Sequence, residues 1–227
     1  MFDTPILNRL RKLAEDITAI FDKRMERYDN PKHIHEFEGW TDTFWKSDTI
    51  RKCHLKIIEP IEGKPKLWLM HINIFPNTNE CLPILGLDVV SGPNKISGSF
   101  FDFSPVTDET NPMVQTFAAA TSNLVWKKER ELPPWAQEIF SPHMVAAGNV
   151  REEETEQFCE TALNLIQYYV MSMYSSDSKA YDTKAAHNKY CINQKKNQQL
   201  WSSLRAMKLD SDKIDQYVNN VLFEEIR

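Results

Sequence analysis

The spacing of apolar residues changes twice along the chain and divides it into three zones. In the first zone, apolar residues recur every three or four positions between Ile6 and Phe21. This period predicts an amphipathic helix. Thr4 is a suitable N-cap for it, and Pro5 suits the first helical position. The chain is therefore expected to open with a helix that buries one face.

The second zone begins after a polar stretch over residues 22–36. Trp40 and Trp45 follow in a region expected to be irregular or a short strand. From Arg51 to Ser104 the apolar period is two, which is typical of antiparallel strands joined by turns. Connections rich in proline, glycine and polar residues separate four predicted strands, namely Arg51–Ile58, Leu67–Phe75, Ile84–Val90 and Ile96–Ser104.

The third zone returns to helical spacing. Asn149 precedes a predicted helix whose first turn is acidic, as the helix dipole favours. A long polar helix is predicted over about residues 183–207, and a final one carries Ile214 and Leu222. Helices on both sides of a central antiparallel sheet predict an α/β fold, a three-layer α/β/α sandwich. The absence of repeats and linkers predicts a single domain over residues 1–227.

Composition excludes several classes of function. The six glycines form neither a dinucleotide-binding fingerprint nor a phosphate-binding loop. The four cysteines are far apart, so no metal site or disulfide framework is expected. The net charge of -5 argues against a nucleic-acid partner. No apolar run is long enough for a membrane span, and the first residues do not resemble a signal peptide, so a cytoplasmic protein is expected.

The lengths of the connections predict a row of titratable residues across the sheet. Residues 59–66 and 76–83 form two connections of eight residues each. Symmetric pairing about them places His54 opposite His71, and His71 opposite Asp88. Directly opposed side chains lie about 5 Å apart on one face. The row His54–His71–Asp88 is therefore a candidate proton-transfer site.

The neighbours of this row are mostly apolar. An aspartate among them is expected to be desolvated and to share a proton with an adjacent histidine. Gly86 leaves a flat patch on which a planar ligand could approach the backbone. The plain structural alternative is that Asp88, His54 and His71 are ordinary hydrogen-bonded polar groups of a strand.

Several blocks of sequence match a known family in consistent order. They are Arg51–Leu55, His71–Pro76, Leu82–Pro93, Asp102–Pro105, Arg130–Trp135, Glu138–Ser141, Tyr190–Cys191, Gln194, Lys196–Asn197 and Val221–Phe223. Together they resemble the ferredoxin-dependent bilin reductases. The resemblance begins near Arg51 and continues to the carboxyl terminus.

This resemblance implies an enzyme that holds biliverdin between the sheet and the carboxyl-terminal helices. Reduced ferredoxin would supply single electrons and the protein would supply protons, with no permanently bound flavin or metal. It further implies a monomer that receives biliverdin from an upstream heme oxygenase. Asp88 falls on the aspartate that protonates the bilin. His71 falls on its histidine partner, and His54 on a second histidine joined to that one through hydrogen bonding.

The resemblance also implies substrate contacts. Arg130 and Ser97 match residues that bind a bilin propionate; alternatively, they are a solvated cation and an ordinary strand serine. Gln194 and Asn197 share a predicted helical face with Tyr190, and this face could pack against a tetrapyrrole. Alternatively, that face is a core stripe with two satisfied amides.

Two departures from the family pattern bear on the product. Lys56 stands where phycocyanobilin-forming members carry a glutamate that serves reduction of the D-ring vinyl group. By parity Lys56 lies on the same face as His54, so it is expected to line the pocket as a substrate-binding residue. An ammonium, however, cannot replace that carboxylate with the same geometry or charge. Gln198-Gln199 stands where close relatives carry an acid followed by a lysine. Four-electron reduction to phycoerythrobilin is therefore favoured.

Other functions remain open on the sequence. They are reduction to phycocyanobilin, a two-electron reduction to dihydrobiliverdin, and a bilin-binding protein without catalysis. A nicotinamide-dependent reductase is disfavoured by the glycine inventory. A basic docking face for acidic ferredoxin is expected at Lys127, Lys128, Lys195, Lys196, Arg205 and Lys208, although such charges are more often an ordinary solvated surface.

Overall fold

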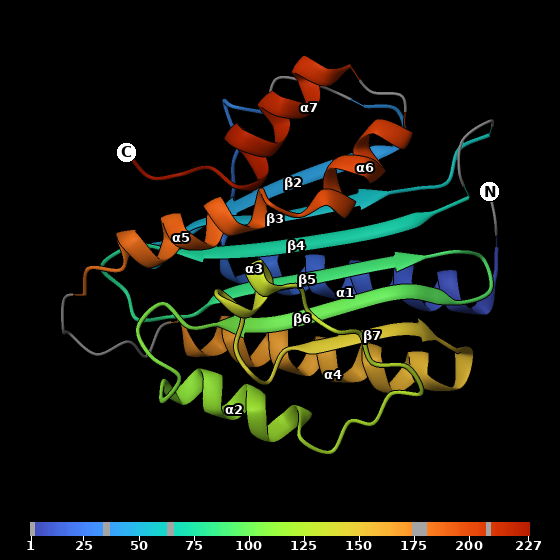
Figure 1. The fold of residues 1–227 in the computed structure, drawn as a ribbon, viewed down its shortest axis with the longest axis horizontal. Coiled ribbons are helices and arrows are strands. Elements are labelled where there is room, and N and C mark those ends of the chain that lie inside the picture. Colours follow the sequence, from blue (N-terminus) through green and yellow to red (C-terminus); the bar gives the residue numbers. More distant parts are fainter. Residues whose placement is uncertain (1–2, 34–36, 63–65, 174–180, 208–209) are drawn as a thin grey trace.

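A seven-stranded antiparallel sheet forms the centre of the protein (Figure 1). The computed structural model describes residues 3–33, 37–62, 66–173, 181–207 and 210–227. Each strand pairs with the next one in the chain. The strands are β1 (Glu26–Arg27), β2 (Trp40–Lys46), β3 (Ile50–Ile58), β4 (Trp68–Pro76), β5 (Ile84–Ser91), β6 (Ile96–Ser104) and β7 (Val145–Val150).

Helices cover both faces of this sheet (Figure 1), which confirms the predicted α/β sandwich. One face packs against α1 (Pro5–Arg24), α2 (Pro112–Thr121) and α4 (Glu152–Ser172). The other is covered by α3 (Pro134–Gln137), α5 (Lys184–Gln194), α6 (Gln198–Ala206), α7 (Ser211–Tyr217) and the π-helical turn η1 (Val218–Leu222). The Thr4 side chain accepts a hydrogen bond from the Leu7 amide, as expected of an N-cap.

The two faces of the sheet differ in polarity because side chains alternate along each strand. On β5, Leu85, Leu87 and Val89 are fully buried in the core formed with α1 and α4. Gly86 and Asp88 point to the opposite face and are partly exposed. The strands therefore place the polar residues of the candidate site under α5, α6 and α7.

The predicted pairing is correct for one connection and wrong for the other. His71 lies opposite Asp88, as predicted. His54, however, lies opposite Asn73, and the residue opposite His71 is Lys56. The hairpin is shifted by two positions because it does not close symmetrically about residues 59–66. A shift of two keeps every side chain on its face, so His54 still lies beside His71.

The structure adds detail to three other predicted regions. Trp40 and Trp45 belong to a regular strand, β2. Asn149 lies in β7 with φ of 53°, and Arg151 is the N-cap of α4, whose first turn is acidic as predicted. The long helix predicted over residues 183–207 is two helices, because Asn197 accepts hydrogen bonds from the Gln199 and Leu200 amides and begins α6.

Candidate active site

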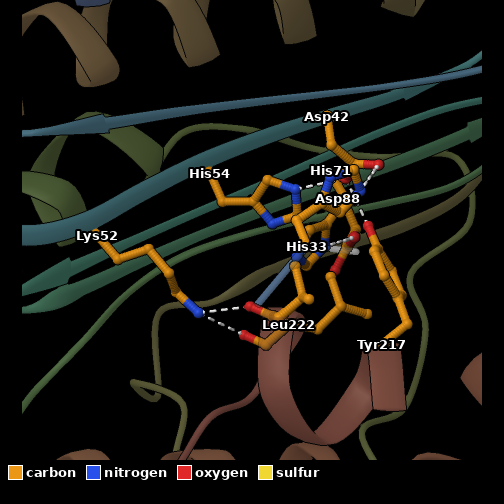
Figure 2. A network of polar contacts seen from close by, with 9 residues as sticks. His33, Asp42, Lys52, His54, His71, Asp88, Tyr217 and Leu222 are labelled. Atoms are coloured by element: carbon orange, nitrogen blue, oxygen red, sulfur yellow. Dashed lines mark hydrogen bonds and ion pairs between the residues drawn. The ribbon is translucent and has the colours of Figure 1, made fainter. Parts of the chain in front are cut away.

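Four titratable residues form a continuous row across four neighbouring strands. Asp42 on β2 pairs with Lys56 on β3, which pairs with His71 on β4, which pairs with Asp88 on β5. His54 lies on the same face of β3, two residues before Lys56. Figure 2 shows His54, His71 and Asp88 close together, with Tyr217 reaching Asp42 from the helix drawn below the strands.

His71 and Asp88 form a direct hydrogen-bonded pair. Nδ1 of His71 lies 2.6 Å from Oδ1 of Asp88. The His71 side chain is 7% exposed, whereas that of Asp88 is 44% exposed. The expected desolvation of Asp88 is therefore wrong: its carboxyl group faces an open cavity. The pair joins a buried imidazole to a carboxyl group that a ligand can reach.

His54 does not hydrogen-bond His71 within the described part of the chain. Its Nε2 lies 2.6 Å from Oδ1 of Asp42, and its ring stacks on Phe44. The His54 and His71 ring centroids are 6.0 Å apart. Burial lowers the pKa of His54 to about 3, although Asp42 opposes this shift. His54 is therefore neutral, and its Nε2–H donates to the Asp42 carboxylate.

Asp42 was not predicted from the sequence, yet it connects several elements. Its Oδ1 accepts a 2.5 Å hydrogen bond from the Tyr217 hydroxyl, and its Oδ2 lies 3.2 Å from Nε2 of His33. Burial alone would raise the pKa of Asp42, but hydrogen bonds from His33 and His54 and the nearby Lys56 hold it below its usual range. The alternation of Trp40, Asp42 and Phe44 was the signal that could have identified this strand and its inward aspartate.

Lys56 is buried within the same face. Its Nζ lies 4.9 Å from the Trp40 ring centroid and 5.2 Å from that of Tyr217, which are favourable cation–π distances. Burial lowers the pKa of Lys56, and the charges of Asp42 and Asp88 partly offset this effect. Lys56 lies outside the cavity wall that contains Asp88, so a direct substrate contact by Lys56 remains a prediction.

A cavity of about 390 Å³ opens above Asp88. This volume lies within the range of small-molecule sites, about 300–1,000 Å³. Apolar and aromatic side chains contribute most of its surface, and amides and charged groups contribute the rest. The lining residues are Asp88, Phe100, Arg130, Glu131, Leu132, Pro133, Trp135, Ala136, Phe140, Met144, Gln194, Lys196, Asn197, Gln198 and Gln199. The cavity suits a flat apolar ligand with polar edges.

Arg130 is held at the edge of this cavity. Its Nη2 donates to the Ser97 carbonyl at 2.6 Å, and its guanidinium lies 5.7 Å from the Phe100 ring centroid. A side chain at Gly148 would come within 2.8 Å of Nε, so that glycine makes room for the arginine. The fixed guanidinium can receive an anionic group of a ligand.

Ser97 and Gly86 do not line the cavity. The Ser97 hydroxyl donates a hydrogen bond to the Val90 carbonyl at 2.9 Å, as expected of an ordinary strand serine. A Cβ at Gly86 would lie 2.9 Å from the Tyr190 hydroxyl oxygen. The Tyr190 hydroxyl therefore occupies part of the space above Gly86, and a ligand contact at Gly86 stays a prediction.

Gln194 and Asn197 do line the cavity, but each also has a structural partner. Nε2 of Gln194 donates to the Tyr190 hydroxyl at 2.9 Å. The Asn197 side chain caps α6. Gln198 and Gln199, the residues that depart from the family pattern, belong to the same wall. The turn between α5 and α6 thus supplies neutral amides to the cavity.

Two further observations concern other types of site. Among the described residues, no cluster of three His, Cys, Asp or Glu side chains could hold a metal ion. In the same part of the chain, no helix is both long enough and apolar enough to span a membrane.

Comparison with known proteins places this chain in a family. The chain is 30% identical over 187 residues to a phycocyanobilin:ferredoxin oxidoreductase of Prochlorococcus marinus (strain MIT 9515), covering 80% of this chain and 75% of the relative. It is 27% identical over 239 residues to the enzyme of that name from Gloeobacter violaceus, covering 97% and 90%.

The solved structure of tomato phytochromobilin synthase in complex with biliverdin has the same fold. The TM-score is 0.74 at 13% identity, over 94% of this chain and 82% of that protein. The family model for ferredoxin-dependent bilin reductases matches residues 7–224. With nearly the whole chain matched, the protein belongs to the ferredoxin-dependent bilin reductase family.

Proposed function

We propose that this protein reduces biliverdin to a phycobilin, using single electrons from ferredoxin and protons from its own side chains. The observation that carries the proposal is the His71–Asp88 pair, with its 2.6 Å hydrogen bond and its carboxyl group facing the 390 Å³ cavity. Simple binding of a bilin needs neither a proton donor nor a buried imidazole behind it.

Each electron added to the bilin makes the conjugated system more basic, and a proton from Asp88 neutralises the added charge. His71 Nδ1 is within hydrogen-bond distance of the carboxyl oxygen, so it can return a proton to Asp88. A four-electron reduction consumes four electrons and four protons. Asp88 must therefore be protonated again during each turnover.

Arg130 binds a propionate of the substrate in this proposal. Its guanidinium is already oriented by the Ser97 carbonyl, so less side-chain freedom is lost when a carboxylate binds. The aromatic rings of Phe100, Trp135 and Phe140 in the cavity wall pack against the pyrrole rings. Gln194 and Asn197 meet the edge of the ligand.

The favoured product is phycoerythrobilin. Lys56 occupies the position of the vinyl-directed glutamate, and it is held between Trp40 and Tyr217 rather than in the cavity wall. Gln198 and Gln199 offer the ligand amides and no carboxyl group. Protonation by Asp88 without a carboxylate directed at the D-ring vinyl group favours reduction at the methine bridge beside the D ring, followed by the A ring.

Anaerobic turnover with biliverdin and reduced ferredoxin, followed by chromatography of the products, tests this proposal. A product that coelutes with phycoerythrobilin is expected, with a dihydrobiliverdin at early times. Coelution with phycocyanobilin would contradict the product assignment. A dihydrobiliverdin that persists at the end would indicate a two-electron enzyme, and unchanged biliverdin absorbance would indicate a bilin-binding protein.

Ferredoxin docks on basic residues near the cavity in this proposal. Lys196 lines the cavity itself, whereas Lys127 is paired with Glu153 and Lys195 with Glu225. Lys208 lies outside the described residues. The turnover rate should fall as salt screens the two proteins, while biliverdin affinity stays constant. A salt-independent rate would contradict electrostatic docking.

A further inference from the structure

A second cavity lies over β1 and β2, on the far side of the titratable row from Asp88. It measures about 520 Å³. Its wall is formed by Arg27, Tyr28, Asp29, Asn30, His33, Asp42, Thr43 and Phe44. Asp42 therefore belongs both to this cavity and to the hydrogen-bonded network that contains His54 (Figure 2).

We propose that this second cavity is a proton-entry site, and that His33, Asp42 and His54 relay protons from it to His71 and Asp88. The inference rests on the proposed function, because the reduction consumes protons at Asp88. A bilin in the first cavity would cover the exposed side of that carboxyl group. Protons from solvent must then reach the pair from behind, through His71.

Exposure decreases along this path from the surface to the interior. The His33 side chain is 20% exposed, that of Asp42 is 2% exposed and that of His54 is fully buried. His33 Nε2 lies 3.2 Å from one oxygen of Asp42, and His54 Nε2 lies 2.6 Å from the other. A single carboxylate thus bridges an accessible imidazole and a buried one, as a proton relay requires.

The two buried imidazoles complete the path. Nδ1 of His54 and Nε2 of His71 are both buried and have no partner among the described residues. With the ring centroids 6.0 Å apart, one water molecule can bridge the two nitrogens. This leaves His71 with one nitrogen toward His54 and the other bonded to Asp88.

The proton steps balance without any change in electron count. The transfer starts from the His54 tautomer that carries its proton on Nδ1 and leaves Nε2 free to accept. His33 passes a proton to Asp42, Asp42 passes it to Nε2 of His54, and Nδ1 of His54 releases one to the bridging water. This step leaves His54 in the Nε2–H form that donates to Asp42. The water passes a proton to Nε2 of His71, and Nδ1 of His71 releases one to Asp88. Each ring gains a proton at one nitrogen and loses one at the other, and it returns to its starting tautomer before the next transfer.

Single turnovers with biliverdin bound in advance test the relay. Asp42→Asn should slow the proton-coupled steps about 100-fold, the scale of a lost acid–base group, with biliverdin affinity unchanged. The solvent isotope effect should rise, because proton supply becomes limiting. Asp29→Asn makes the same chemical change in the same cavity wall but outside the relay, and it should leave rate and isotope effect unchanged. A normal rate in Asp42→Asn would overturn the proposal.

His33→Ala removes the ring at the entrance and its contact with Asp42, but it leaves the Asp42–His54 and His71–Asp88 hydrogen bonds in place. It should slow turnover, and added imidazole should restore the rate by replacing the lost ring in an accessible cavity. A slow His33→Ala variant that imidazole does not accelerate would overturn the entry site.

A measurement without bilin separates the relay from the reductase activity. Solvent exchange of the His54 ring proton, followed by NMR, should slow in His33→Ala and stay unchanged in Asp29→Asn. If the protein does not reduce biliverdin but this exchange depends on His33, the proposed function fails and the proton entry stands. If biliverdin is reduced but exchange of the His54 ring proton is the same in His33→Ala as in the unmodified protein, only the relay proposal fails.

Discussion

The hydrogen bond between His71 Nδ1 and Asp88 Oδ1 joins a buried ring on one strand to an exposed carboxyl group on the next. Antiparallel pairing fixes the two Cα positions, since His71 and Asp88 are direct partners of β4 and β5. The sheet therefore aims the Asp88 carboxyl group at the cavity before any ligand arrives. This arrangement is preorganised for proton transfer.

Asp88→Asn should bind biliverdin normally but yield little product, with turnover reduced about 100-fold or more. The amide keeps the shape of the side chain but cannot donate a carboxylic proton. A one-electron-reduced bilin should accumulate and be detectable by electron paramagnetic resonance. Full activity in this variant would refute the role assigned to Asp88.

His71→Gln should slow or redirect the reduction rather than prevent binding. The amide can still hydrogen-bond Asp88, but it cannot return a proton to it. Product chromatography and a biliverdin titration measure the two effects separately. Loss of binding with an unchanged rate at saturation would show that His71 only shapes the cavity.

Arg130→Ala should chiefly weaken biliverdin binding. A charge-assisted hydrogen bond contributes about 1.5–3 kcal/mol, which corresponds to a dissociation constant raised about 10- to 150-fold. Titration by absorbance measures the effect. Lys128→Ala, two residues away on an exposed position, is the matched control and should bind as the unmodified protein does. Equal weakening in both variants would indicate general electrostatics.

Lys52 should make stability depend on pH in the alkaline range. Its Nζ donates to the carbonyls of Val221 and Leu222, and burial, with Arg51 nearby, lowers the pKa of Lys52 to about 7. Between pH 7 and the ordinary value of 10.5, the unfolded chain binds the proton and the folded protein does not. Stability therefore rises with pH across this window, by up to about 1.4 kcal/mol per unit, and is constant below it.

Urea unfolding of Lys52→Met at several pH values measures this contribution as a difference from the unmodified protein. The gap between the two proteins should change between pH 7 and 10 and be constant below pH 7. Parallel stability curves would show that Lys52 keeps an ordinary pKa.

Gly86→Ala should destabilise the fold by about 1–3 kcal/mol, the usual cost of overpacking. The new methyl group would meet the Tyr190 hydroxyl oxygen at 2.9 Å. Thermal or urea unfolding measures the loss, and adding Tyr190→Phe should recover part of it. Gly92→Ala is the control, because its nearest neighbour is the Lys95 carbonyl at 3.9 Å. Equal losses at both glycines would point to backbone freedom instead.

Local patterns predicted the layers of this fold and the core of its site. The period-two spacing of apolar residues predicted the strands, and Thr4 predicted the start of the first helix. Both signals lie within the element that they predict. The His71–Asp88 pair followed from one connection length. The partner of His54 on β4 could not be predicted in the same way. The β3–β4 hairpin does not close symmetrically about residues 59–66, and its two-residue shift depends on contacts made across the sheet.

The features of the site that the sequence did not predict depend on contacts between segments that are distant in the chain. Asp42 joins the network through Tyr217, which is 175 positions away in the chain. The exposure of Asp88 depends on where α3 and the α5–α6 turn leave a cavity. Such relationships between distant segments cannot be read from spacing within one strand.

The break between α5 and α6 determines which residues of the cavity wall can be substituted without loss of helix packing. A continuous helix would place only one side chain in every three or four in the cavity wall. The turn instead presents Gln194 and 196–199, nearly every consecutive side chain, while Tyr190 and Leu204 on either side stay buried. Contacts with the edge of a bound ligand can therefore vary by substitution at Gln198 and Gln199, while the Asn197 cap and the Gln194–Tyr190 hydrogen bond keep the helices in place.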